Sequence, residues 1–225
     1  MISLRVEAPY ASFRTSFARS FAETYPLPPP ATIYGMLLSL VGERQRRTHL
    51  GVKLSIGFFR RPRLSTILKR LSRYKYGVPS KQARLGNAPD YVEVLCGIEC
   101  VVLVDSAFES PGLTLEQRLS LALDSPERIE RTGILCLGLS NDMVDVVRAS
   151  DGLEESDIEW LTLDGHGSLE LPVWVDHVGS ADTRWRRFSL VQSNNDETAS
   201  GRWITIMTPI EIDQADQQGR IGYVT

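Results

Sequence analysis

The sequence of 225 residues has only three cysteines and three histidines, and it has no long apolar run. No run reaches the roughly 18 residues that a membrane-spanning helix needs, so we expect no membrane partner and a cytoplasmic location. An odd number of cysteines without secretory features favours reduced, structural thiols. Cys96 and Cys100 have no second cysteine or histidine pair to complete a zinc site, so we expect no metal and no cofactor.

Several catalytic motifs are also missing. The sequence has no GxGxxG, GxxxxGK[ST], GxSxG or HExxH pattern, and it therefore gives no support for nucleotide hydrolysis or for serine or zinc hydrolysis. Carboxylates such as Asp142 and Asp145 lie in hydrophilic acidic runs without a histidine nearby. We interpret these runs as solvated surface, not as the site of a metal-dependent nuclease.

Charge is distributed very unevenly, although the net charge is only −3. Residues 1–90 contain 16 Lys and Arg against 4 Asp and Glu (net +12), and residues 91–225 contain 9 basic and 24 acidic residues (net −15). Between Arg44 and Arg84 there are 13 basic residues and no acidic one. We favour a nucleic-acid partner for this acid-free tract. The alternative is a solvated basic face that pairs with the acidic half of the chain.

Hydrophobic periodicity predicts an alternation of strands and helices over the first 140 residues. The predicted elements are a strand Ile2–Glu7 that ends at Pro9, a helix from an N-cap at Thr32, a strand Val52–Phe58, strands Val92–Leu95 and Ile98–Val104, a helix from a Thr114–Gln117 capping box, and a buried strand Ile134–Leu139. This order is that of the ferredoxin-like, RNA-recognition-type α+β fold, with one antiparallel sheet and two helices on one face.

The segment "TYPLPPPATIYGMLL" joins the long loop after the first strand to the first helix. Each proline fixes φ and favours an extended residue before it, so "PLPPP" delivers the chain stiffly to one point. The helix that follows has an apolar stripe for a core, and its N-terminal N–H groups could hold a phosphate. A core helix with a rigid entry explains the same residues.

The remaining organisation divides the chain into two predicted domains. Residues 1–140 form the ferredoxin-like domain, with a basic insertion at about 61–90 between its second and third strands. Within this insertion, "RLSTILKRLSRYKYG" has helical spacing of apolar residues and is either a short amphipathic helix or part of an extended excursion. Residues 141–225 are acidic, rich in turn signals, and predicted to be a small, mostly β domain that faces protein.

Two segments carry a resemblance to a known family. "ASFR" followed by "TYPLPPPATIYGMLLSLVG", and later "LALDSPERIERTGILCLGLSND", resemble the CRISPR-associated Cascade subunits of family five over roughly residues 1–145. The resemblance implies a ferredoxin-like domain that grips the 5′ handle of the guide RNA (crRNA) and caps the backbone filament of a type I surveillance complex. It also implies contacts with the backbone subunit of family seven and with the large subunit, and it leaves contact with target DNA near the PAM open. The insertion at 61–90 would be the thumb of this family.

Charge and the resemblance together define the candidate binding residues. Single-stranded RNA is held by cations along its backbone and by bases stacked on aromatic or guanidinium planes. The residues that we expect to contact RNA are Arg14, Arg19, Tyr25, Tyr34, Arg60, Arg61, Arg63, Lys69, Arg73, Tyr74, Lys75, Tyr76, Lys81 and Arg84.

Catalysis is an open alternative at this stage. One branch of the resembled family cleaves precursor RNA without a metal, which requires a general base near the 2′-hydroxyl and an acid near the leaving oxygen. His49 with Tyr34 and a lysine would be the candidate group, but we interpret His49 as a surface or capping residue. We therefore expect a non-catalytic RNA-binding subunit, with a metal-independent endoribonuclease as the alternative. A ferredoxin-like protein outside the family, whose basic patch serves another anion, is a third possibility.

Overall fold

The computed structural model describes residues 1–15, 21–73, 86–109, 112–150, 157–175, 183–192 and 201–207, without the side chains of 70–73 and 86–89. The elements in chain order are β1 (Ile2–Ala11), β2 (Phe21–Ala22), α1 (Pro30–Leu40), β3 (Lys53–Phe58), β4 (Arg63–Arg73), β5 (Gly86–Asp105), α2 (Leu115–Asp124), η1 (Pro126–Arg128), β6 (Val146–Ala149), β7 (Glu159–Leu163), β8 (Leu169–Val175), β9 (Thr183–Gln192) and β10 (Ile204–Thr205).

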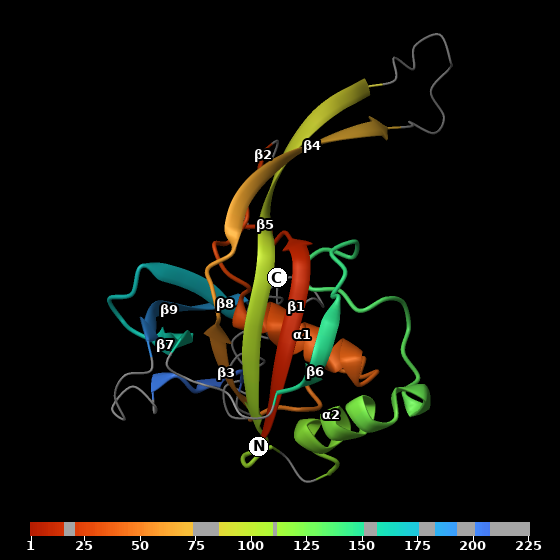
Figure 1. The fold of residues 1–225 in the computed structure, drawn as a ribbon, viewed down its shortest axis with the longest axis vertical. Coiled ribbons are helices and arrows are strands. Elements are labelled where there is room, and N and C mark those ends of the chain that lie inside the picture. Colours follow the sequence, from red (N-terminus) through yellow and green to blue (C-terminus); the bar gives the residue numbers. More distant parts are fainter. Residues whose placement is uncertain are drawn as a thin grey trace, which may run out of the picture.

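These strands form one large sheet, and the protein has an α+β fold (Figure 1). The strand order is β6-β1-β5-β3-β7-β9-β8. Outside this order, β2 and β4 pair with β5, and β10 pairs with β3. All pairings are antiparallel except the short one between β2 and β5. β6, β7, β8 and β9 come from beyond residue 140 but continue the sheet of the earlier strands. The predicted boundary at 140 therefore coincides with no break in the sheet, and the division into two domains stays a prediction.

β5 is the longest strand, and it belongs to two parts of the molecule. Its second half lies between β1 and β3 in the sheet, where Val102 pairs with both Leu4 and Ile56. Its first half extends beyond the sheet and pairs with β4 from Arg63↔Cys96 to Arg73↔Gly86. Figure 1 shows this β4–β5 hairpin, called the arm below, rising away from the rest of the molecule.

The two faces of the sheet are covered differently, because neighbouring residues of a strand point to opposite faces. Val102 and Val104 point to the face that carries both helices, where they share a core with buried residues of α1 and α2 such as Leu37 and Leu119. Val101 and Leu103 point to the other face, where a smaller cluster includes Ile158, Trp160 and, at its edge, Phe59 and Trp203. The second face is therefore not an open platform.

Local sequence signals explain both helices. α1 begins at Pro30, directly after Pro29 as its N-cap, because a proline at the first helical position has the required φ and lacks an N–H that would stay unbonded. The predicted N-cap at Thr32 is wrong by one turn. The predicted capping box of α2 is confirmed: the Thr114 side chain accepts from the Gln117 N–H, and the Gln117 side chain accepts from the Thr114 N–H.

Two strand predictions differ from the structure, and one alternative that the sequence left open is decided by it. β1 continues past Pro9 to Ala11, and beyond Glu7 it has no β6 neighbour, so the missing N–H of Pro9 costs no pairing on that side. The two strands predicted around 92–104 are one strand with Gly97 at a φ of 70°. Of the two alternatives left open for the insertion, the structure has the extended one, because Arg63–Arg73 is β4.

The predicted buried strand Ile134–Leu139 is also wrong. Only Cys136 makes a bridge, to Met143, and the Ile134 side chain is 55% exposed. The strand that pairs with β1 on its outer side is β6 instead. No described helix is long and apolar enough to cross a membrane.

Gly57 offers a test of the packing on the second face. A Cβ added there would lie 2.4 Å from Ile158 Cγ2 and 3.0 Å from both Trp160 Cε3 and Val101 Cγ1. We expect Gly57→Ala to lower the free energy of unfolding by about 1–3 kcal/mol, because these side chains must move apart. Urea unfolding measures it. Gly165→Ala, where an added Cβ meets nothing within 4 Å, is the control and should change stability by less than about 0.5 kcal/mol. Equal stability of the two variants would contradict the packing.

Candidate functional site

The base of the arm brings three predicted RNA-binding arginines together. Arg60 and Arg61 lie in the short connection between β3 and β4, and Arg63 is the first residue of β4, where the chain leaves the sheet to form the arm. The side chains of Arg60 and Arg61 are 68% and 64% exposed, and Arg63 is also exposed. This connection places a cluster of cations at the point where the arm meets the sheet.

The three arginines differ in what else they contact. Arg61 donates two hydrogen bonds to Glu159, at 2.9 and 2.7 Å, and these bonds hold the pKa of Glu159 below its ordinary value. Arg60 approaches Glu99 at 3.4 Å without such geometry. Arg63 forms no ion pair within the described part of the chain. Arg61 thus ties the base of the arm to β7, whereas Arg60 and Arg63 remain available to an anion.

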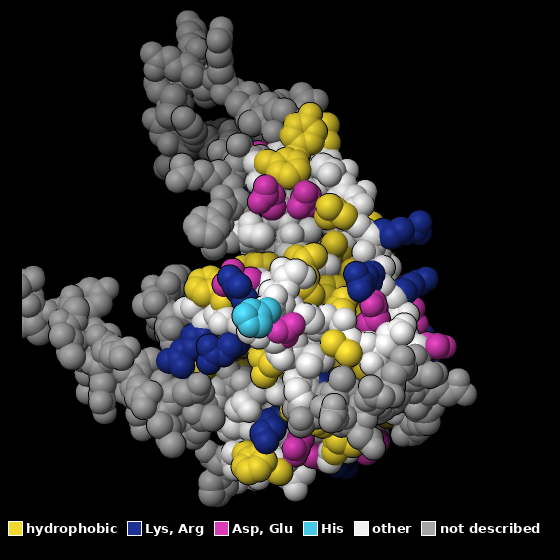
Figure 2. Space-filling model, turned by 90° about the vertical axis from the view of Figure 1, so that its left-hand side faces the viewer, with side chains coloured by type: hydrophobic (Ala, Val, Ile, Leu, Met, Phe, Trp, Pro, Cys, Tyr) yellow, Lys and Arg dark blue, Asp and Glu magenta, His cyan; other side chains and the backbone are white. Residues whose placement is uncertain are grey.

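One face of the arm carries a row of exposed apolar side chains across three strands. Phe21 of β2 pairs with Tyr91 of β5, which pairs with Leu68 of β4, so the three side chains lie side by side. Their exposed fractions are 41%, 49% and 61%, and Leu64, further along β4, is 60% exposed. Figure 2 shows apolar side chains gathered at this upper end, beside acidic ones. This row includes two aromatic rings that the sequence analysis did not select.

The opposite face of the arm is partly covered. Val92 and Val94 of β5 form a small buried cluster with Ala22 of β2, and Ile67 packs against it. Lys69, predicted to bind RNA, lies on β4 directly opposite Asp90 of β5 and is partly exposed. The arm is therefore a three-stranded unit at its base, with one face packed and the other open.

Tyr34 was predicted to face RNA, and the structure contradicts this. Its ring is fully buried, its hydroxyl donates to the backbone oxygen of Arg46 at 2.8 Å, and burial raises its pKa above the ordinary value. Its ring centroid is 6.3 Å from that of Trp174 on β8, and the Arg46 guanidinium stacks on both rings. Tyr34 lies on the apolar side of α1, so it stabilises the contact between α1 and β8 and is not a stacking platform.

The other predicted residues of the N-terminal loop are distributed over the surface. Arg14 is exposed and makes a bridge to Thr24. Tyr25 is partly buried, and its hydroxyl accepts a hydrogen bond from Trp185 Nε1 of β9 at 3.2 Å. Arg19, Tyr74, Lys75, Tyr76, Lys81 and Arg84 lie outside the described residues, and so does the side chain of Arg73.

Three exposed cationic and aromatic side chains on β9 were missed by the sequence analysis. Trp185, Arg186 and Arg187 are exposed on this strand, and Trp185 is joined to Tyr25 by the hydrogen bond described above. The run "RWRR" is the signal that could have identified them. It was overlooked because the second half of the chain is acidic on average, and an average charge does not show where single cations lie.

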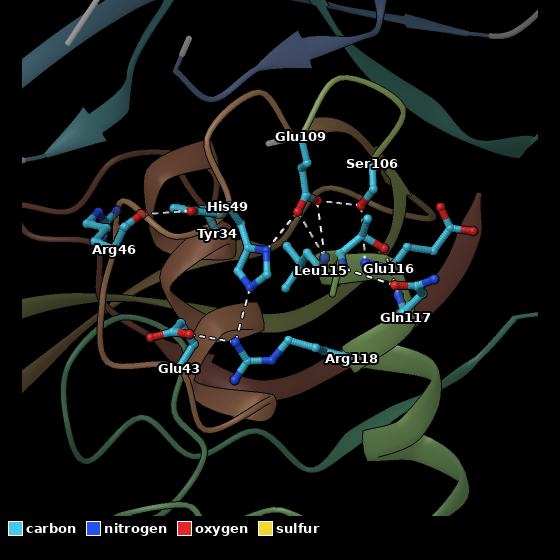
Figure 3. A network of polar contacts seen from close by, with 11 residues as sticks. Tyr34, Glu43, Arg46, His49, Ser106, Glu109, Leu115, Glu116, Gln117 and Arg118 are labelled. Carbon is cyan, nitrogen blue, oxygen red and sulfur yellow. Dashed lines mark hydrogen bonds and ion pairs between the residues drawn. The ribbon is translucent and has the colours of Figure 1, made fainter. Parts of the chain in front are cut away.

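His49 is not a surface residue, which corrects the interpretation of this histidine. It is 1% exposed and lies between α1 and α2, with Nδ1 2.7 Å from Glu109 and Nε2 3.3 Å from Arg118 Nη1 (Figure 3). Glu109 also accepts from the N–H of Leu115 and from the Ser106 hydroxyl. The histidine is therefore held inside a polar network that joins the two helices.

The described ranges contain no group of side chains suited to metal or thiol chemistry. No cluster of three or more His, Cys, Asp or Glu residues could hold a metal ion there. Asp142 is buried and accepts from the N–H groups of Ser12 and Leu139, which explains its position structurally. Burial raises the pKa of the Cys100 thiol to about 12, so this cysteine is not a nucleophile at neutral pH.

Glu43 gives a test of the network around His49. Although burial raises its pKa, the Gln45 N–H and the Arg118 guanidinium at 2.5 Å outweigh this and hold the pKa below its ordinary value. The folded state therefore gains stability above the ordinary carboxyl pKa and loses it as the pH falls. We expect Glu43→Gln to cost about 1.5–3 kcal/mol at pH 7, and less as the pH is lowered below the ordinary carboxyl pKa, in urea unfolding over this pH range. Glu127→Gln, at an exposed position, is the control. A cost that does not change with pH would contradict the ion pair.

Comparison with known proteins identifies the family of this chain. Residues 1–133 match the family model described as CRISPR-associated protein (Cas_Cas5). A CRISPR-associated protein Cas5 from Myxococcus xanthus (strain DK1622) is 37% identical over 187 residues, which cover 82% of this chain and 87% of that protein. 

Two solved structures share the fold. A chain of a "CRISPR RNA-guided surveillance complex" aligns with a TM-score of 0.55 and 16% identity over 84% of this chain and 88% of its own. A chain described as "Crystal structure of Cas protein" aligns with a TM-score of 0.51 and 15% identity over 84% and 93%. The family-model match over more than half of the sequence and the 37% identical relative show that the chain belongs to the Cas5 family of CRISPR-associated proteins.

Proposed function

We propose that this protein is a non-catalytic RNA-binding subunit of a type I CRISPR surveillance complex, which grips the 5′ handle of the crRNA and caps the backbone filament. The observation that carries the proposal is the arm, which leaves the sheet beside the exposed Arg60 and Arg63 in a tract without acidic residues. The structural relative in an RNA-guided surveillance complex supports the same assignment through its fold.

We also propose the finer description of the fold that this function uses. The elements β1, α1, β3, β5, α2 and β6, with the sheet order β6-β1-β5-β3, are the six elements of a ferredoxin-like unit. The arm, inserted between β3 and the second half of β5, is the thumb that the family resemblance implies. In this assignment β7, β8, β9 and β10 are additions that extend the sheet beyond β3.

Two kinds of contact would hold the RNA. Arg60 and Arg63 pair with phosphates, since both guanidinium groups are exposed and neither is fixed by a bidentate carboxylate. Tyr91 and Phe21 offer ring faces to unstacked bases on the same arm. The covered second face of the sheet favours the arm over the sheet as the binding surface, because Ile158 and Trp160 already occupy that face.

The protein partners are the backbone subunit of family seven and the large subunit, with contact to target DNA near the PAM as a further possibility. The exposed apolar row of the arm supports a protein contact, because Leu64 and Leu68 have more than half of their surface in water. 

The alternative of a precursor-processing endoribonuclease is not favoured by the described residues. His49 is 1% exposed and held by Glu109, and Tyr34 is fully buried, so neither reaches a 2′-hydroxyl in this arrangement. We expect the purified chain, incubated with end-labelled repeat RNA in EDTA, to give no defined product on a sequencing gel. A single cut at one phosphate would replace the proposed function by the nuclease.

The arm makes a quantitative prediction for RNA binding. The double variant Arg60→Gln and Arg63→Gln should bind an oligonucleotide of the CRISPR repeat more weakly than the wild type. The slope of log K against log salt should fall by about 0.7 for each lost phosphate contact. Fluorescence anisotropy at salt concentrations between about 50 and 300 mM measures both the affinity and the salt slope.

The matched control is the double variant Arg44→Gln and Arg128→Gln, which removes the same charge from exposed positions beside the helices. This control should keep the wild-type salt slope. If both double variants change the slope equally, the effect is one of net charge, and the arm is not the binding surface.

A further inference from the structure

A groove between the two helices is not used by the proposed RNA-binding function. It has a volume of about 540 Å³ and lies between the turn after α1, the exposed side of α2 and the segment after η1. Its lining residues are Val41, Gly42, Arg44, Leu113, Arg118, Leu121, Arg128, Ile129 and Glu130. The volume is within the range of about 300–1,000 Å³ that is typical of ligand sites, so the groove accommodates a few side chains at once.

The lining carries more cations than carboxylates. It contains three arginines and one glutamate, Glu130, and one of these arginines, Arg118, pairs with Glu43. Arg44 donates to the Thr132 hydroxyl at 2.8 Å, and neither Arg44 nor Arg128 forms an ion pair with any residue that the structure describes. Both side chains are exposed. The groove therefore offers two cations without a carboxylate partner to an acidic group.

Apolar side chains border these cations. Leu113 is 61% exposed and Leu121 is 38% exposed, although both belong to the lining of one groove, and Ile129 is partly buried beside them. The lining contains no aromatic ring on which a base could stack. Leucine beside arginine matches a protein partner better than a nucleic acid, since apolar contacts and arginine pairs are typical of protein interfaces.

The floor of the groove is preformed. Arg118 is fixed by Glu43, by the Val41 oxygen at 3.0 Å and by His49 (Figure 3). Gly42 has a φ of 70°, and a Cβ at this position would lie 2.4 Å from the Glu130 oxygen. The wall formed by Glu130 therefore packs directly on the turn after α1. A site whose shape is already set costs less ordering when a partner binds.

We propose that this groove binds a peptide segment of another protein subunit of the same complex, with an Asp or Glu flanked by leucine-type side chains. The carboxylate pairs with Arg44 and Arg128, and the apolar side chains pack on Leu113 and Leu121. This inference rests on the proposed function, because the partner is a subunit of the complex that the chain joins. The site is distinct from the arm, so each can be tested by itself.

The test measures association of the purified chain with each protein encoded beside its gene, by biolayer interferometry after RNase treatment. The charge reversal Arg44→Glu with Arg128→Glu should weaken binding to one of these proteins by at least about tenfold. Leu121→Asp should weaken binding to the same protein. The controls, at positions that are also exposed, are Arg148→Glu on β6 and Leu163→Asp on β7, which should bind as the wild type does.

A photo-crosslinking residue in place of Leu121 then identifies the segment by mass spectrometry. A crosslink to a segment with a carboxylate would support the proposal. So would recovery of binding to the Arg44/Arg128 charge-reversal variant when that carboxylate is changed to arginine. The proposal would be overturned if both groove variants bind as the wild type does, or if the controls lose as much binding. It would also be overturned if the chain binds none of these proteins, or if Leu121 crosslinks to RNA. Unchanged repeat-RNA binding and salt slope in the arm variant, with the groove variants behaving as proposed here, would overturn only the proposed RNA contact.

Discussion

The backbone pairing of β5 is the constraint on which the structure depends. Residues of its second half occupy the centre of the sheet, where Val102 and Val104 help to form the main core, and residues of its first half support β4 and β2 in the arm. A strand in the middle of a sheet has a fixed register, because a shift by one residue would turn its apolar side chains to the wrong face. The packing of β5 in the core therefore determines the direction of the arm, and the end of β3 determines the position of the cations at its base.

Sequence reasoning succeeded where the determining interaction is local. The capping box of Thr114 and Gln117 and the proline entry into α1 involve residues within one turn of a helix, and both helices are where they were expected to within a few residues. It failed or stayed undecided where the partner is distant. The apolar residues of β4 have helical spacing, which left a helix and an extended segment open, and pairing with β5 makes the segment a strand. For Ile134–Leu139 an apolar run suggested a strand, yet β6 took the position beside β1.

The candidate site was predictable in part for the same reason. A tract of 41 residues without a carboxylate was visible in the sequence and leads to the exposed Arg60 and Arg63. What the sequence could not show is which cations find carboxylates elsewhere: Arg61 meets Glu159, about 100 positions later, in a bidentate pair. Tyr34 and His49 also required the fold, because their burial depends on Trp174 and Glu109, which approach from other elements.

Gly97 marks the place where β5 passes from the sheet to the arm. This glycine has a φ of 70°, in the left-handed region, and it lies between Cys96 and Ile98, which pair with Tyr10 and Ala8. The strand passes this point while Cys96 and Ile98 stay paired with β1. Because a side chain disfavours a positive φ, the path of β5 from the sheet into the arm depends on a glycine at position 97.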